Sequence, residues 1–227
     1  MQIELLHQPG NTAARITLEQ HQSCTAESGA MIAMSGNMGI TTTTHKKKSG
    51  GLIKAIKRVV AGESLFLNHF ETTQGTGEVL LGTALAGDML DLELDNENLI
   101  VQGSSFLACE DGIEVDLGWQ GFKSVFSGER VFWVNLSGKG KVLLSSFGAI
   151  YPVEVDGETI VDTGHIVAFN ETLDFTVTKA GSSWIQSFLG GEGLVCKFQG
   201  KGTVWCQSHN PNSFGSSLTS GLRARRA

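Results

Sequence analysis

The chain has 227 residues, of which 41% are hydrophobic and 18% charged, and this balance excludes an intrinsically disordered protein. The net charge of −6 argues against general nucleic-acid binding. The sequence contains no apolar run of about 18 residues, the length needed to cross a membrane. The opening MQIELLHQPG lacks a basic leader followed by a long apolar run. We therefore expect a cytoplasmic protein without a secretory signal.

Four landmarks recur three times in the same order along the chain, which indicates an internal repeat. Each unit opens with a short apolar segment, continues through a Gly/Ser-rich apolar stretch to a Gly-Glu pair, and closes with a Gly-x-Gly pair. The openings are SGAMIAM from Ser28, QGSSFLAC from Gln102 and TGHIVAF from Thr163, and the closing pairs are Gly75/Gly77, Gly138/Gly140 and Gly200/Gly202. The predicted units are 14–94, 95–155 and 156–214, followed by a basic tail at 215–227.

The Gly-x-Gly pairs, with apolar runs on both sides, predict hairpin turns in which glycine supplies the positive φ. A turn centred at Lys201 would set Cys196 opposite Cys206, close enough for a disulfide. Two buried thiols are the favoured interpretation, since reduced cysteines are the rule in the cytoplasm. The other predicted facing pairs are Val134/Leu144, Leu136/Val142, Phe198/Val204 and Lys197/Trp205.

The joins between units, LELDNENLIVQG and VEVDGETIVDTG, each predict a strand, a short turn at Asp-Asn or Asp-Gly, and a second strand. A lone hairpin cannot bury its apolar face, whereas three packed together can. The sequence thus predicts a single compact all-β domain, built from three small antiparallel sandwich units with short helices between strands. In the first unit Asn68 replaces the apolar residue of the other two, and we expect a hydrogen-bonded structural amide there.

The stretch THKKKSGGLIKAIKRVV is the one local charge anomaly, with six basic residues and no acidic one. Its apolar residues follow helical spacing, which predicts a short amphipathic helix. Such a helix could contact an anionic membrane surface or an acidic partner, or could cover one open end of the sheet with its cationic side chains in water. The second alternative is favoured. The candidate contact residues are Lys46, Lys47, Lys48, Lys54, Lys57 and Arg58.

Several long motifs in order resemble the altered-inheritance-of-mitochondria protein 24 family, a family of unknown function. The motifs cover roughly residues 15–215, and they are SGAMIAMSGNM, GGLIKAIKRVVAGESLFLNHF, PVEVDGETIVDTGHIVAF and GEGLVCKFQGKGTVWCQSHNP. The resemblance implies a fold similar to that of the tryptophan RNA-binding attenuation protein, in repeated sandwich-like units. It implies no catalytic residues, and the ligand-binding residues of that fold namesake have no matching motif here.

No pattern in the sequence assembles a catalytic, metal-binding or cofactor-binding site. The four cysteines show no CxxC spacing, and the six histidines show no H-x-H or HExxH spacing. The Gly-x-Gly pairs lead into predicted strands and so differ from phosphate-binding loops. His165 and His209 are the best isolated candidates, but a structural role is favoured for both.

The sequence therefore favours a non-enzymatic scaffold or interaction protein that works as a homo-oligomer and carries no cofactor. One alternative is a small-molecule binder with a pocket between units, lined by Trp119, Trp133, Trp184 or Trp205. A further alternative is peripheral attachment to an anionic membrane or, less favoured, to nucleic acid through residues 46–58.

Overall fold

The computed structural model describes residues 1–43, 66–116, 133–179 and 194–221. These residues form antiparallel β-structure almost throughout, as the sequence predicted, and the α-helix found among them is α3 (Pro211–Gly221), after the last strand. The side-chain oxygen of Asn210 accepts hydrogen bonds from the backbone N–H groups of Asn212 and Ser213, and so it caps the start of this helix. Part of the predicted basic tail is therefore helical.

The strands fall into three consecutive groups. The first holds β1 (Gln2–Leu6), β2 (Ala13–Leu18), β3 (Ser23–Glu27), β4 (Met31–Met34), β5 (Met38–Thr43), β6 (Leu67–Thr72) and β7 (Gly77–Leu81). The second holds β8 (Met89–Asp95), β9 (Leu99–Gln102), the 3₁₀ turn η1 (Gly103–Ser105), β10 (Phe106–Glu110), β11 (Ile113–Asp116) and β12 (Trp133–Ser145). The third holds β13 (Ile150–Asp162), η2 (Thr163–His165), β14 (Ile166–Asn170), β15 (Asp174–Lys179) and β16 (Leu194–Gln207).

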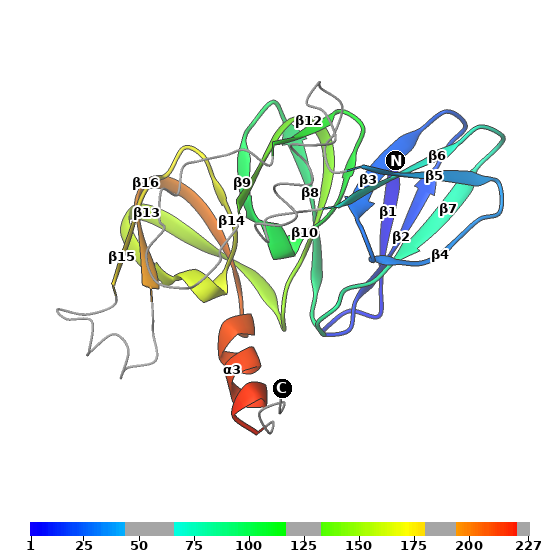
Figure 1. Cartoon of the computed structure of the whole chain (residues 1–227). Helices are drawn as coiled ribbons and strands as arrows, with labels where there is room; N and C mark the ends of the chain where they lie inside the picture. The colour runs from blue at the N-terminus through cyan, green and yellow to red at the C-terminus, as the bar shows by residue number, and fades with distance from the viewer. Residues whose placement is uncertain (44–65, 117–132, 180–193, 222–227) are drawn as a thin grey trace, which may run out of the picture.

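The three groups lie side by side, with the N-terminal group at the right of Figure 1 and the C-terminal group at the left. Strands β1, β2, β7 and β4 form a four-stranded sheet, and the other strands form one large sheet that runs through all three groups. Strand β3 pairs with β10, and β9 pairs with β14, so backbone hydrogen bonds join each group to the next.

The Gly-x-Gly pairs are not hairpin turns, and this part of the prediction was wrong. Gly138/Gly140 and Gly200/Gly202 lie inside the long strands β12 and β16. Strand β16 keeps β13 as its partner on one side, and on its other side it pairs with β15 before the glycines and with β14 after them. The first half of β12 pairs with β9 and β11, and its second half pairs with β8 and β10. Glycine is needed there because φ is 112° at Gly138 and 116° at Gly200.

The predicted facing pairs fail for the same reason, since their members lie on one continuous strand. Cys196 lies opposite Val161 and Val177, and Cys206 lies opposite Tyr151 and Ile166, so no Cys196–Cys206 pair exists. The pairs Val134/Leu144, Leu136/Val142, Phe198/Val204 and Lys197/Trp205 are likewise absent. All four cysteines are buried and outside any disulfide, as the favoured interpretation held.

The joins between groups differ from one another. Strands β8 and β9 do flank a short turn, in which Asn96 has φ 64°, as predicted. The second join is one unbroken strand, β13, which bends at Gly157 (φ 104°) in place of the predicted turn. In each join, the segments before and after the bend pair with one strand. That strand is β12 for the first join and β16 for the second.

Each group surrounds its own cluster of buried apolar side chains. The first cluster includes Ile16, Phe70 and Val79, the second includes Val134 and Leu136, and the third includes Phe169 and Phe198. The strands that join the groups contribute to two clusters, because Leu107 of β10 packs in the first and Val167 of β14 packs in the second. The cores are thus linked through the joining strands. Asn68 is buried and accepts a hydrogen bond from the Thr42 hydroxyl at 2.8 Å, as expected for a structural amide.

Candidate interaction site

The basic segment proposed as a contact surface, residues 46–58, lies outside the described residues. Its six candidate residues, Lys46, Lys47, Lys48, Lys54, Lys57 and Arg58, and its predicted helix stay predictions. Other groups that could carry chemistry or binding lie within the described residues.

The two histidine candidates have structural surroundings. Nδ1 of His165 lies 2.8 Å from the carbonyl oxygen of Gln207, which ties η2 to the end of β16. Nδ1 of His209 lies 2.8 Å from the Ser208 hydroxyl, and its ring packs on Phe147 with a centroid distance of 4.9 Å. The Ser208 hydroxyl also accepts the backbone N–H of Ala149, so this serine and histidine join two chain segments.

A third histidine, which sequence analysis did not single out, bridges two strands. The ring nitrogens of His69 lie 2.9 Å from the Thr25 hydroxyl and 2.6 Å from the Thr43 hydroxyl. These threonines come from β3 and β5, the two neighbours of β6. Cross-strand polar contacts of this kind fix the sheet, and two threonine hydroxyls occupy both nitrogens of the ring.

The tryptophans that could have lined a ligand pocket pack in apolar cores where the structure describes them. Trp133 is 3% exposed, and its ring lies edge-on to that of Phe169 at 5.6 Å. Trp205 packs against the second core cluster. Trp119 and Trp184 lie outside the described residues.

The buried cysteines are poor nucleophiles. Burial raises the pKa of Cys196 to about 12 and that of Cys206 to about 11, so both thiols stay protonated at neutral pH. Across residues 1–43, 66–116, 133–179 and 194–221, no three His, Cys, Asp or Glu side chains gather as metal ligands would.

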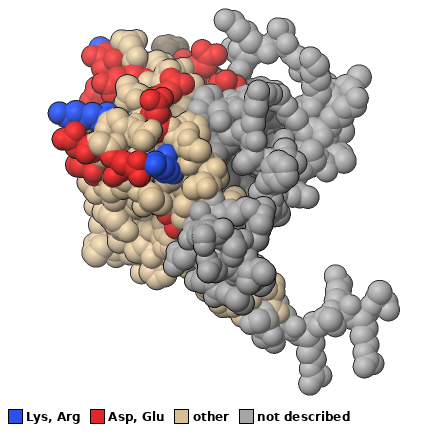
Figure 2. All heavy atoms as spheres, turned by 90° about the vertical axis from the view of Figure 1, so that its left-hand side faces the viewer, with Lys and Arg blue, Asp and Glu red and all other residues tan. Residues whose placement is uncertain are grey.

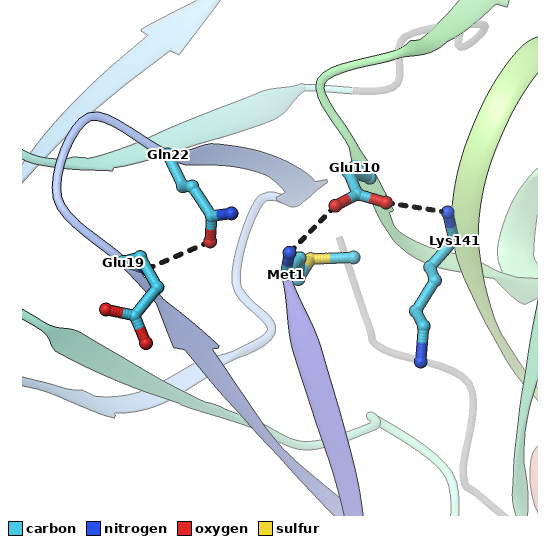
Figure 3. Close-up of polar contacts among 5 residues, drawn as sticks. All are labelled: Met1, Glu19, Gln22, Glu110 and Lys141. Carbon is cyan, nitrogen blue, oxygen red and sulfur yellow. Dashed lines mark hydrogen bonds and ion pairs between the residues drawn. The ribbon is translucent and has the colours of Figure 1, made fainter.

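Glu110, at the end of β10, makes the close-packed polar contact shown in Figure 3. One carboxylate oxygen lies 2.8 Å from the Met1 amine, and the other accepts the backbone N–H of Lys141 at 3.0 Å. Burial raises the pKa of Glu110, but these bonds and the neighbouring positive charges outweigh it, so the net shift is downward. An ionised carboxylate held this way connects β10 to β12.

Of the acidic residues that the structure describes, Glu27 has the pKa that its surroundings shift most. It ends β3, and burial raises its pKa from 4.5 to about 7. Between these two values the folded chain keeps a proton that the unfolded chain has lost. Stability from this group is therefore complete below pH 4.5 and is lost as the pH rises to about 7, with no further change above.

We expect the Glu27→Gln variant to lose this pH dependence. The free energy of unfolding of the unmodified protein should fall by up to about 3 kcal/mol more than that of the variant between pH 4.5 and pH 8. Urea unfolding of both proteins at a series of pH values measures the difference. Parallel pH profiles for the two proteins would contradict a half-buried Glu27 with a raised pKa.

An exposed apolar strand lies at the N-terminal end of the described structure (Figure 1). All four residues of β4 are exposed, with Met31 at 39%, Ile32 at 58% and Met34 at 36%. Strand β4 pairs with β7 on one side, and no described strand pairs with its other side. An open edge carrying large apolar side chains is the kind of surface that natural proteins pair or protect.

A second open edge lies at the opposite end of the molecule, where β13 closes the large sheet (Figure 1). Strand β13 pairs with β16 alone among the described strands, and Ile160 near its end is 61% exposed. Acidic side chains gather on this face (Figure 2), and exposed acids on β13 and β15 include Glu154, Asp156, Glu158 and Asp174. Glu158 is paired with Lys197 at 2.6 Å. Ile160 therefore stands as an apolar residue within a charged surface.

Sequence analysis did not locate these edges in the chain. The segments that form them, SGAMIAM and GETIVD, look like segments that are buried elsewhere in the chain. Their exposure depends on which strand lies beside them, and the only signal in the sequence was the repetition itself.

The fold and its surfaces define an antiparallel β-protein with linked apolar cores and with exposed apolar side chains on its edge strands, β4 and β13 among them. No helix in the described part of the chain has the length and apolar character needed to span a bilayer. Residues 3–209 match the family model described as mitochondrial biogenesis AIM24, and the chain belongs to this family. The family resemblance found in the sequence is thus confirmed.

The relatives found by comparison are themselves uncharacterised. An uncharacterised protein of Streptococcus pyogenes serotype M6 is 31% identical over 209 residues, which cover 89% of this chain and 84% of that protein. A crystal structure of a Streptococcus pyogenes protein superposes with a TM-score of 0.80 at 27% identity, covering 97% of this chain and 99% of that chain.

Proposed function

We propose that this protein is a non-enzymatic scaffold or interaction protein that forms homo-oligomers, and that it consists of three copies of one β unit. The observation that carries the proposal is the exposure of large apolar side chains on two edge strands, three of them on β4 and Ile160 near the end of β13. Large apolar side chains that are exposed on strand edges promote association, and an assembly would cover them. Here these side chains are Met31, Ile32, Met34 and Ile160.

Two recurring details support the three-unit interpretation. The first is a register shift at the same point of β4, β10 and β14, against partners that each follow a Gly-x-Gly pair. The second is a hydrogen bond from the backbone N–H after the second glycine to a side chain at the end of the opening segment. The three bonds run from Glu78 N–H to Ser35 Oγ, from Lys141 N–H to Glu110 Oε2, and from Thr203 N–H to Asn170 Oδ1.

The non-enzymatic part rests on how the reactive side chains are used. Histidines 69, 165 and 209 join strands or turns through hydrogen bonds, and Cys196 and Cys206 are buried with raised pKa values. In the described residues these groups serve packing and cross-strand contacts, which suits a binding or assembly role.

Light scattering coupled to gel filtration tests the proposal. At micromolar concentration we expect a mass that is a multiple of the 24.2 kDa chain. A strictly monomeric species across this concentration range would overturn it.

A further inference from the structure

We propose that copies of this chain assemble head to tail, with β4 of one copy pairing antiparallel with the end of β13 of the next copy. The inference rests on the proposed function and adds to it the two surfaces, their direction and their register. The partner is a second copy of this chain.

The template for this contact is already present twice within the chain. Strand β10 pairs antiparallel with β3, with Ala108 opposite Ala26. Strand β14 pairs antiparallel with β9, with Ala168 opposite Val101. In both cases the opening strand of one unit extends the sheet of the unit before it.

Strand β4 is the counterpart of β10 and β14 in the first unit. Each of the three strands makes the same kind of contact within its own unit, followed by the same register shift before an alanine. The aligned pairs are Met31 opposite Leu81, Phe106 opposite Leu144, and Ile166 opposite Cys206. The residue that follows each of these differs in exposure. Leu107 is 1% exposed and Val167 is fully buried, whereas Ile32 is 58% exposed. Among the described residues, no strand covers Ile32 as β3 and β9 cover its counterparts.

The end of β13 is in turn the counterpart of β3 and β9. Thr25, Ile100 and Ile160 each lie opposite the corresponding residue of the neighbouring strand, His69, Asn135 and Lys197 respectively. Thr25 is 2% exposed and Ile100 is fully buried, because β10 and β14 cover them. Ile160 is 61% exposed, and no described strand lies on its open side as β10 and β14 lie beside Thr25 and Ile100.

The apolar cores show where the exposed side chains would go. Leu107 packs in the core of the first unit and Val167 in the core of the second, each one unit back from its own. By the same rule Ile32 enters the core of the third unit of the neighbouring copy. The charges beside this edge are already satisfied, since Glu158 is paired with Lys197 and Asp162 accepts the backbone N–H of Gly164.

The internal contacts fix the register of the proposed one. Cys109 lies opposite Thr25 and Phe169 lies opposite Ile100, one residue beyond the alanine pairs. Across copies this places Ala33 opposite Val161 and Met34 opposite Ile160. The two surfaces differ, so the contact is heterologous, and it either closes into a ring or continues as a filament.

Cysteine crosslinking between two single variants tests the register. Directly opposed side chains have Cβ atoms about 4.5–5.5 Å apart, a separation that favours disulfide formation after small adjustments. A mixture of Met34→Cys and Ile160→Cys proteins should give a covalent dimer under mild oxidation, and neither variant alone should. The matched control replaces Ile160→Cys by Tyr151→Cys, which is on the same strand and 44% exposed but outside the proposed contact. The native cysteines are buried and should not compete.

A charge substitution tests the role of Ile32 without the need for crosslinking. Ile32→Glu should weaken assembly at least tenfold and leave the circular dichroism spectrum of the chain unchanged, because Ile32 is 58% exposed in the single chain. Ile40→Glu, at a 43% exposed position on β5, should leave assembly unchanged. An oligomer that survives Ile32→Glu and gives no Met34–Ile160 crosslink overturns this inference but keeps the proposed function. A monomeric unmodified protein overturns both.

Discussion

Phe169→Ala is expected to reduce the free energy of unfolding by about 3–5 kcal/mol, a large part of the stability of an ordinary domain. Phe169 is fully buried in the third core. Its ring packs against Trp133 at 5.6 Å, Phe175 at 5.3 Å and Phe198 at 5.1 Å. Removing the ring leaves a cavity among three other aromatic rings that cannot collapse to fill it. Urea unfolding at a fixed protein concentration measures the loss.

Phe66→Ala provides the matched control for this substitution. Phe66 is 39% exposed and lies just before β6, so its removal should cost less than about 1 kcal/mol. A loss at Phe169 no larger than the loss at Phe66 would show that the third core is not packed as described.

The hairpin error shows what a local pattern cannot resolve. A hairpin turn and a sharply bent strand both place positive-φ glycines between apolar runs with a two-residue period. The two structures differ in the strands with which the segment pairs. The partners of β12 lie between Met89 and Asp116, so they all precede β12, which begins at Trp133. The sequence located the positions of unusual backbone correctly, at Gly138 and Gly200, but not their use.

The all-β class and the family were predictable because both depend on features spread along the whole chain. Alternating apolar residues, many glycines and few prolines indicate strands wherever they occur. The open edges were not predictable, since Ile32 and Leu107 occupy equivalent positions in similar segments. One is exposed and the other buried because β3 lies beside β10, whereas no described strand lies on the open side of β4.

Gly138→Ala is the other substitution with a large expected effect, because two separate costs add at this position. The first is the backbone, since φ is 112° and an L-residue rarely adopts it, at a cost of about 1–3 kcal/mol. The second is space, since an added Cβ would lie 2.4 Å from the carbonyl oxygen of Gly112. Moving that backbone disturbs the pairing of β11 with β12 and costs about 1–3 kcal/mol more. Thermal and urea unfolding measure the sum.

Gly200→Ala separates the two costs. Gly200 has nearly the same φ, 116°, in the corresponding bend of β16, but an added Cβ would meet its nearest atom, on Leu173, at an ordinary 3.8 Å. It should therefore show the backbone cost alone, about 1–3 kcal/mol. If the two variants lost the same free energy, the close approach of Gly112 to the bend of β12 would be wrong. If neither lost any, the bends would not need glycine, and the account of β12 and β16 as strands that change partners at these residues would fail with it.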